Sequence, residues 1–279
     1  MSPPSSIVFR TGNIITTGRT SLEKSNQELL NSLRQNFEDA ASRVTSEQPS
    51  WIEAEGDTVY VPRIEEPDGL SEERTEYDIT VKLFYLPGVS VSRRKDHTRE
   101  ALQNVLRELR VPSIDLLIIS FPNISFDAED HSPDTEPTQE EVDEWAETYQ
   151  ALEALQLEGQ IKRIGLSEFG VARLVKLLPR TSIKPSVDQI NVRDCCVVPK
   201  PLIQFAREQK IELLTHNDCT NILPSSALQG LLQENHAVFG GLGNINPQWV
   251  VKYTAVIQDR GVVENKGYFA MAEAEADRL

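Results

Sequence analysis

A few residues whose side chains could take part in catalysis or binding lie in or directly after strand-like segments of this sequence. Lys82 lies inside the apolar run Asp78–Tyr85, and His216 ends the run Ile211–His216, with Asp218 two residues further on. A buried lysine needs a counter-charge, and a histidine beside a carboxylate can act as a general base. No serine or cysteine nucleophile is traceable around His216. We therefore expect a pocket histidine with satisfied hydrogen bonds, an Asp218 that serves as a turn or cap residue, and no metal site.

The cysteines offer a second kind of chemistry. There are three, and two of them, Cys195 and Cys196, are adjacent. Three are too few for a disulfide framework, adjacent cysteines rarely bridge each other, and the CxxC spacing of redox and zinc sites is absent. The favoured interpretation is a pair of small buried side chains, but a redox-active thiol remains the alternative. The polar start Met1–Ile7 predicts no signal peptide, so we expect a cytoplasmic protein.

The elements that would position these residues alternate regularly from residue 78 onward. The expected strands are 78–85, 114–119, 159–167, 186–191, 211–216 and 261–269, and the expected helices are 96–110, 138–155, 170–178, 201–210, 225–232 and 249–260. Before them we expect a strand at 6–12, a helix at 25–44 and a short strand at 58–61. Repeated strand–helix units predict a parallel sheet with right-handed crossovers.

Seven or eight such units close most simply into a (β/α)8 barrel, so we expect one α/β barrel domain over residues 1–279. A doubly wound open sheet is the alternative, but no strand is followed by a GxGxxG turn. The glycine-rich segment 240–244 is a weak candidate for a phosphate-binding loop. Residues 45–77 form a polar, irregular segment, and residues 122–137 form an acidic loop.

The charge is unevenly distributed. The 279 residues carry a formal charge of −15, and 13 Asp and Glu residues but no Lys or Arg lie between Arg110 and Lys162. An acidic chain is a poor binder of nucleic acid or of anionic membranes, because both need a cationic face. The acidic tract predicts either a solvated surface or, over Phe126–Glu147, a contact with a basic patch of a partner protein.

Several segments resemble the aldo-keto reductase family. They are Ser113–Pro122, Trp145–Leu155, Gly159–Phe169 with its G-x-I-x-x-I-G-x-S-x-F pattern, Val187–Asn191 and Leu213–His216. The resemblance implies a (β/α)8 TIM barrel that binds NADPH and reduces carbonyl groups with a tyrosine acid, a lysine, an aspartate and a histidine. Here the barrel would be irregular around its second strand and truncated at the C-terminus.

The catalytic set that the resemblance implies is incomplete. Lys82 matches the family lysine, but Ser120 stands where the family has its histidine. The segment that would carry the aspartate and the tyrosine is not recognisable between Val44 and Tyr77, where Tyr60 and Tyr77 are candidates by residue type alone. Without an acid, Lys82 cannot run the reaction, so we expect Lys82 and Ser120 to be vestigial.

The cofactor positions depart from the family in the same way. Ser167 and Gln189 match residues that hold the nicotinamide amide, but Glu168 replaces an asparagine and His216 replaces a stacking tyrosine. Lys266 is the lysine in the segment that matches the last strand of the family, where Glu264 adds a further negative charge. We expect these to be vestigial positions, with no cofactor or at most weak residual NADPH binding.

Further segments resemble one branch of this fold, the regulatory subunits of glutamate–cysteine ligase. These are Gln189–Pro199 with the adjacent cysteines, Leu213–Asp218, Trp249–Tyr253 and Arg260–Tyr268. The resemblance implies a non-catalytic partner of the ligase catalytic subunit in a heterodimer, enhancing the first step of glutathione biosynthesis. Cys195 and Cys196 would then be candidates for a partner contact or a redox link. A divergent NADPH-dependent reductase stays open as the alternative.

Overall fold

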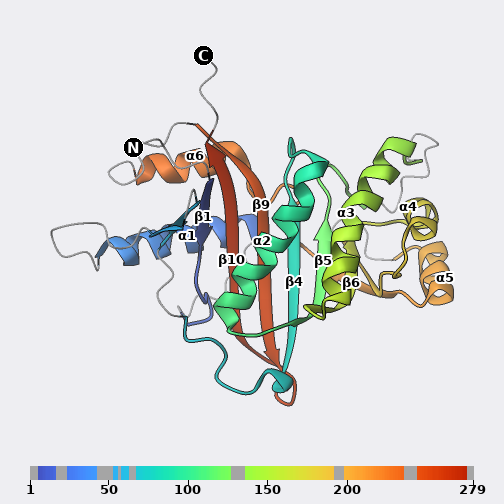
Figure 1. The fold of residues 1–279 in the computed structure, drawn as a ribbon, viewed down its shortest axis with the longest axis horizontal. Helices are drawn as coiled ribbons and strands as arrows, with labels where there is room; N and C mark the ends of the chain where they lie inside the picture. The colour runs from blue at the N-terminus through green and yellow to red at the C-terminus, as the bar shows by residue number, and fades with distance from the viewer. Residues whose placement is uncertain are drawn as a thin grey trace.

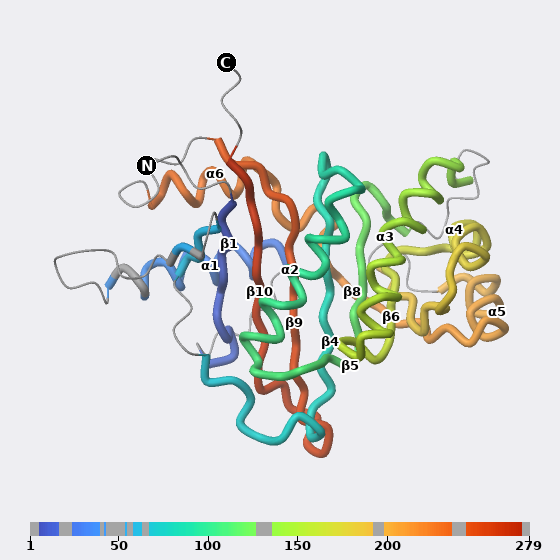
Figure 2. The backbone as a smooth tube through the Cα atoms, viewed as in Figure 1, coloured from blue at the N-terminus to red at the C-terminus, as the bar shows by residue number. Residues whose placement is uncertain are grey.

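The computed structural model describes residues 6–16, 24–42, 53–55, 58–62, 67–126, 136–191, 198–235 and 244–274. Figures 1 and 2 show one long sheet with helices packed along it. The strands are β1 Ser6–Arg10, β2 Glu53–Glu55, β3 Thr58–Val61, β4 Tyr77–Tyr85, β5 Ile114–Ser120, β6 Ile161–Ser167, β7 Val187–Asn191, β8 Glu212–His216, β9 Ile245–Ile257 and β10 Val262–Ala274. The helices are α1 Ser25–Ser42, α2 Val91–Leu109, α3 Gln139–Leu157, α4 Val171–Leu177, α5 Lys200–Gln209 and α6 Ser225–Glu234.

The sheet has a parallel half and a mixed half. Its strand order is β2-β3-β1-β10-β9-β4-β5-β6-β7-β8, and every neighbouring pair from β4 to β8 is parallel. The expected α/β architecture of aldo-keto reductase type is confirmed. It departs from the expected barrel of parallel strands in two ways: the long antiparallel hairpin β9–β10 lies between β1 and β4, and the strand pairings among the described residues end at β2 and β8.

The expected helix at 249–260 is wrong, because this segment belongs to strand β9. Trp249, Val250, Val251 and Tyr253 are β-branched or aromatic residues, which favour strands. From Val251 to Ile257 the burial alternates between buried and half-buried residues, which is the period of a strand with one better-covered face. The run of apolar residues at 249–251 hides this alternation in the sequence.

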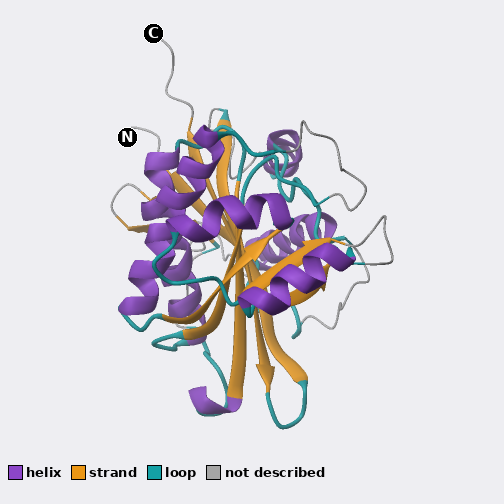
Figure 3. Cartoon of the chain, turned by 90° about the vertical axis from the view of Figure 1, so that its right-hand side faces the viewer, coloured by secondary structure: helices purple, strands orange, loops and turns teal. Residues whose placement is uncertain are grey.

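Two hydrophobic clusters lie on opposite faces of the sheet. Alternate residues of each strand enter different clusters: Leu83 and Val251 belong to the larger one, and Phe84 and Val250 to the smaller one. Helices α2 and α3 lie side by side across one face (Figure 1), while α1 and α6 pack against each other and contribute to the smaller cluster. In the view turned by 90°, several helices are stacked along one side of the strands (Figure 3). No described helix is long and apolar enough to cross a membrane.

The irregular and acidic segments are only partly described. Within the irregular segment 45–77, residues 45–52, 56–57 and 63–66 lie outside the described residues, but the remainder supplies β2 and β3, of which only β3 was expected. Residues 127–135 of the acidic loop also lie outside them. Directly after this loop, α3 begins with a capping box: the Thr138 hydroxyl accepts from the Glu141 amide at 3.2 Å, and the Glu141 carboxylate accepts from the Thr138 amide at 2.8 Å.

Candidate functional site

Lys82 lies at the centre of a buried polar cluster. Its ammonium group donates to Asp218 Oδ2 at 2.9 Å and to Gln189 Oε1 at 2.8 Å. Strand β4 places Lys82 directly opposite Lys252 of β9, and Lys252 Nζ binds the other oxygen of the same carboxylate at 3.1 Å. The Lys82 side chain is 5% exposed and that of Asp218 is 4% exposed. One carboxylate therefore bridges two lysines that face each other across the strands.

Electrostatics explain why this arrangement holds a charged carboxylate away from water. Burial alone would raise the pKa of Asp218, but the positive charges of Lys82 and Lys252 outweigh burial and hold the pKa well below its usual range. Burial lowers the pKa of Lys82, while Asp218 opposes that shift. Removing one of these charged side chains would leave an uncompensated buried charge. The resulting loss of folding free energy is far larger than that from breaking a surface ion pair.

His216 and Glu168 form the second half of the cluster. His216 Nε2 lies 2.5 Å from Glu168 Oε1, and His216 Nδ1 accepts from the Asp218 amide at 3.1 Å. An Nδ1 that accepts a hydrogen bond must be unprotonated, so Nε2 carries the proton and donates it to Glu168. The other carboxylate oxygen of Glu168 accepts from the Phe126 amide at 2.6 Å. The expectation of a histidine with satisfied hydrogen bonds is confirmed.

Glu168 reaches these partners from an unusual backbone conformation. Its φ is 69°, in the left-handed region that non-glycine residues avoid at a cost of about 1–2 kcal/mol. This backbone conformation comes directly after the last residue of β6, and the Glu168 side chain is buried.

Ser167 and Gln189 also lie in the cluster. They are register partners on β6 and β7, and the Ser167 hydroxyl donates to the Gln189 carbonyl at 3.2 Å. The parallel strands β6, β7 and β8 end at the same edge of the sheet, which is why Ser167, Gln189 and His216 come together. Ser120 is half-buried at the end of β5, opposite Phe84 of β4.

Lys266 is not part of this cluster. It lies on β10, where its ammonium group pairs with Glu28 of α1 at 2.6 Å. The Tyr268 hydroxyl donates to the same carboxylate at 3.0 Å, so Glu28 joins α1 to the hairpin. Cys195 and Cys196 lie outside the described residues, so their predicted roles stay predictions.

The tyrosines of the described residues do not supply the missing acid. Tyr77 begins β4, five residues before Lys82, which is roughly 17 Å along a strand. Tyr60 lies on β3, separated from β4 in the sheet by β1, β10 and β9. Tyr268 faces Lys252 across β9–β10, but burial raises its pKa well above the usual value. A proton donor for carbonyl reduction needs the opposite shift.

A nicotinamide cofactor does not fit the cluster in this arrangement. Ser167 is fully buried and bonded to Gln189, and the Gln189 side-chain oxygen is taken by Lys82. Both ring nitrogens of His216 have protein partners, and Glu168 places a carboxylate where an amide is expected. The polar atoms that would hold the carboxamide are thus bonded to one another.

Sequence reasoning missed two members of the cluster. Asp218 was expected to be a turn or cap residue, and that is wrong: it is the shared counter-ion of two lysines. The spacing of His216 and Asp218 after a buried strand was the available signal. Lys252 was hidden because its segment was expected to be a helix. No group of three or more His, Cys, Asp or Glu side chains in the described residues could hold a metal ion.

Several acids in the described part of the acidic tract are paired within the chain. Five of its carboxylates form ion pairs: Asp115 with Arg74 and Lys162, Glu136 with Lys176, Asp143 with Arg180, Glu144 with Arg94, and Glu158 with Arg99. Glu141 caps α3, and Glu153 accepts from the amides of Ser182 and Ile183. In the described part of the tract, most negative charge therefore stabilises the fold.

Comparisons with known proteins agree with this architecture. The model of the aldo/keto reductase family matches residues 64–241. The human glutamate–cysteine ligase regulatory subunit is 31% identical over 72% of this chain and 68% of its own length. The mouse glutamate–cysteine ligase regulatory subunit is 27% identical over 96% of this chain and 93% of its own. The NAD(P)H-dependent D-xylose reductase of Candida tenuis is 35% identical over 42% of this chain and 38% of its own. The chain belongs to the aldo/keto reductase family and, within it, to the glutamate–cysteine ligase regulatory subunits.

Proposed function

We propose that this chain is a non-catalytic subunit that binds the catalytic subunit of glutamate–cysteine ligase in the cytoplasm as a heterodimer. It raises the activity of that subunit in the first step of glutathione biosynthesis. The human and mouse relatives are named as regulatory subunits of this ligase, and the mouse protein aligns along nearly the whole chain.

The observation that carries the non-catalytic part is the state of Lys82. Its ammonium group is buried and bonded to Asp218 and Gln189, and neither partner is a tyrosine hydroxyl. Each described tyrosine with a shifted pKa is shifted upward, mainly by burial. The bonding of the Lys82 ammonium group within the protein therefore supports the proposal that this chain does not catalyse carbonyl reduction.

The experiment combines the purified chain with the purified catalytic subunit. We expect the two to co-elute in size-exclusion chromatography, the KM for glutamate to fall, and inhibition by glutathione to weaken. Failure to co-elute and an unchanged KM would refute the proposal. The catalytic subunit alone, and with an unrelated acidic protein of similar size, serve as controls.

The second candidate is a divergent NADPH-dependent reductase. It is favoured by the gathering of Lys82, Ser167 and Gln189 and by the local similarity to a D-xylose reductase. Titration with NADPH separates the two functions. We expect no tight binding and no turnover of carbonyl substrates, whereas micromolar affinity with reduction that Lys82→Met abolishes would establish the second function.

A further inference from the structure

The segment that follows the acidic tract has the opposite charge. Residues 162–210 contain ten Lys and Arg against four Asp and Glu, in a chain whose formal charge is −15. Two of the four acids, Glu168 and Asp188, are buried, and burial raises the pKa of Asp188 well above its usual range. The formal charge of this segment is therefore positive, and four of its cations pair with acids outside it, namely Lys162, Arg163, Lys176 and Arg180.

Helix α5 and its C-cap residue Lys210 carry cations that have no ion-pair partner among the described residues. Lys200, Arg207 and Lys210 are exposed and form no ion pair with any described residue. On the neighbouring side, Lys176 and Arg180 are paired with Glu136 and Asp143. Within the described residues, the cations at α5 are thus unpaired, while Lys176 and Arg180 beside α4 are paired.

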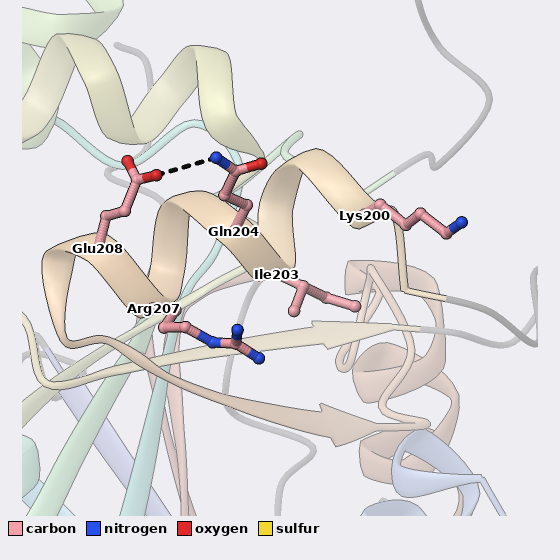
Figure 4. A pocket seen from close by; sticks show the side chains of 5 residues that line it. All are labelled: Lys200, Ile203, Gln204, Arg207 and Glu208. Atoms are coloured by element: carbon pink, nitrogen blue, oxygen red, sulfur yellow. Dashed lines mark hydrogen bonds between the residues drawn. The ribbon is translucent and has the colours of Figure 1, made fainter.

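An apolar side chain stands between two of the available cations. Lys200, Ile203 and Arg207 are spaced by three and four residues, which places them along one face of the helix. Ile203 is 39% exposed, one of four large apolar side chains exposed in the described residues. Figure 4 shows Ile203 and Arg207 on one side of α5, with Gln204 and Glu208 on the other and joined by a 3.0 Å hydrogen bond. These five residues line a surface hollow of about 430 Å3.

We propose that this face of α5 is a docking surface for the catalytic subunit, and that it takes up an acidic segment of that subunit with an apolar side chain at its centre. The inference rests on the proposed function and specifies where the partner binds. Ile203 would receive the apolar side chain, and Lys200 and Arg207 would pair with carboxylates on either side of it. A nucleic acid does not suit this surface, because the rest of the chain would repel an extended polyanion.

Arg207→Glu tests the surface, and Lys95→Glu is its matched control. Both side chains are exposed on helices and both substitutions change the charge by the same amount, but Lys95 lies on α2. Binding to the purified catalytic subunit would be measured by surface plasmon resonance at two salt concentrations. We expect Arg207→Glu to raise Kd about tenfold at low salt and to flatten the salt dependence, and Lys95→Glu to change Kd by less than about twofold.

Ile203→Ser separates the apolar contribution from the charged one. We expect a loss of about fivefold in affinity with the salt dependence of the wild type retained. If Arg207→Glu disturbed the fold by circular dichroism, Lys200→Glu would replace it at the same surface.

The outcomes distinguish a failure of the proposed function from a failure of the docking surface. A wild-type chain that does not bind the catalytic subunit refutes the proposed function and the docking surface with it. A wild-type chain that binds, with Arg207→Glu and Ile203→Ser binding equally well, refutes the docking surface alone. Loss of self-association in Arg207→Glu without loss of ligase binding would assign the surface to a second copy of this chain and overturn the proposal.

Discussion

Lys82 and Lys252 face each other across the antiparallel β4–β9 pair and hold the two oxygens of one buried carboxylate, that of Asp218, at 2.9 and 3.1 Å. Two like charges side by side in a protein interior are unstable without this counter-ion. The cluster thus joins the parallel half of the sheet, the β9–β10 hairpin and the loop after β8. The atoms that a reductase would offer to cofactor and substrate are bonded within the protein.

Asp218→Asn should destabilise the fold strongly. It leaves two lysines without their counter-ion, one of them buried, and the expected loss in the free energy of unfolding is about 3–5 kcal/mol. Asp78→Asn is the matched control, because Asp78 is exposed on the same strand as Lys82 and should change stability by less than about 0.5 kcal/mol. Urea denaturation measures both. Equal midpoints for the two variants would contradict the structural role of Asp218.

The same carboxylate should make stability depend on pH in the acid range. The pKa of Asp218 is lowered in the folded state, so its contribution is complete above the unfolded value of about 3.9 and is lost as pH falls toward the folded value. The difference in stability between wild type and Asp218→Asn should therefore shrink from pH 6 to pH 3. A constant difference would show that the charge of Asp218 is not what stabilises the cluster.

The burial of His97 predicts a second pH dependence of stability, at milder acidity than that of Asp218. It is 2% exposed on α2, and neither ring nitrogen has a hydrogen-bond partner among the described residues. Its pKa is lowered to about 4, mainly by burial and also by Arg93, while Glu273 and Asp96 oppose the shift. The unfolded chain takes up the proton first, so stability should fall as pH drops from about 6.5 to about 4.

The measurement is urea unfolding at several pH values for wild type and His97→Gln, which does not titrate. The variant should lose a slope of up to about 1.4 kcal/mol per pH unit in this window. Parallel curves for the two proteins would contradict burial of a neutral His97.

Gly267 and Gly230 offer a matched pair of glycine substitutions. A Cβ at Gly267 of β10 would collide with the Gly12 carbonyl and with the Tyr253 ring and hydroxyl, whereas a Cβ at Gly230 in α6 meets nothing. We expect Gly267→Ala to lower the melting temperature by several degrees, corresponding to about 1–3 kcal/mol. Gly230→Ala should raise stability by up to about 1 kcal/mol through helix propensity. Thermal unfolding that ranks the two the other way would contradict the close approach at Gly267.

The sequence predicted the parts of the site that depend on parallel strands. Apolar runs such as Ile114–Ile119 indicate strands buried on both faces, and the shared edge where such strands end brings Ser167, Gln189 and His216 together. Lys82 was found because its strand is regular and because its pattern resembles a family with a lysine there.

The other parts depend on contacts that no local pattern encodes. To place Lys252 in the site, the segment after residue 245 must be recognised as a strand. Apolar residues on both faces of this strand hide its alternation of apolar and polar residues. Asp218 gained its role only because β9 brings a second lysine to it. Lys266 matched the family by position, yet α1 supplies Glu28 and holds it in another cluster.

Reconstitution with the catalytic subunit of glutamate–cysteine ligase shows whether this chain activates that subunit without any chemistry of its own. The measurement is the KM for glutamate of the purified catalytic subunit, with and without a stoichiometric amount of this chain, in wild-type and Lys82→Met forms. We expect the wild type to lower the KM without NADPH, and Lys82→Met, if folded, to do the same. An unchanged KM, together with NADPH-dependent carbonyl reduction that requires Lys82, would contradict the account.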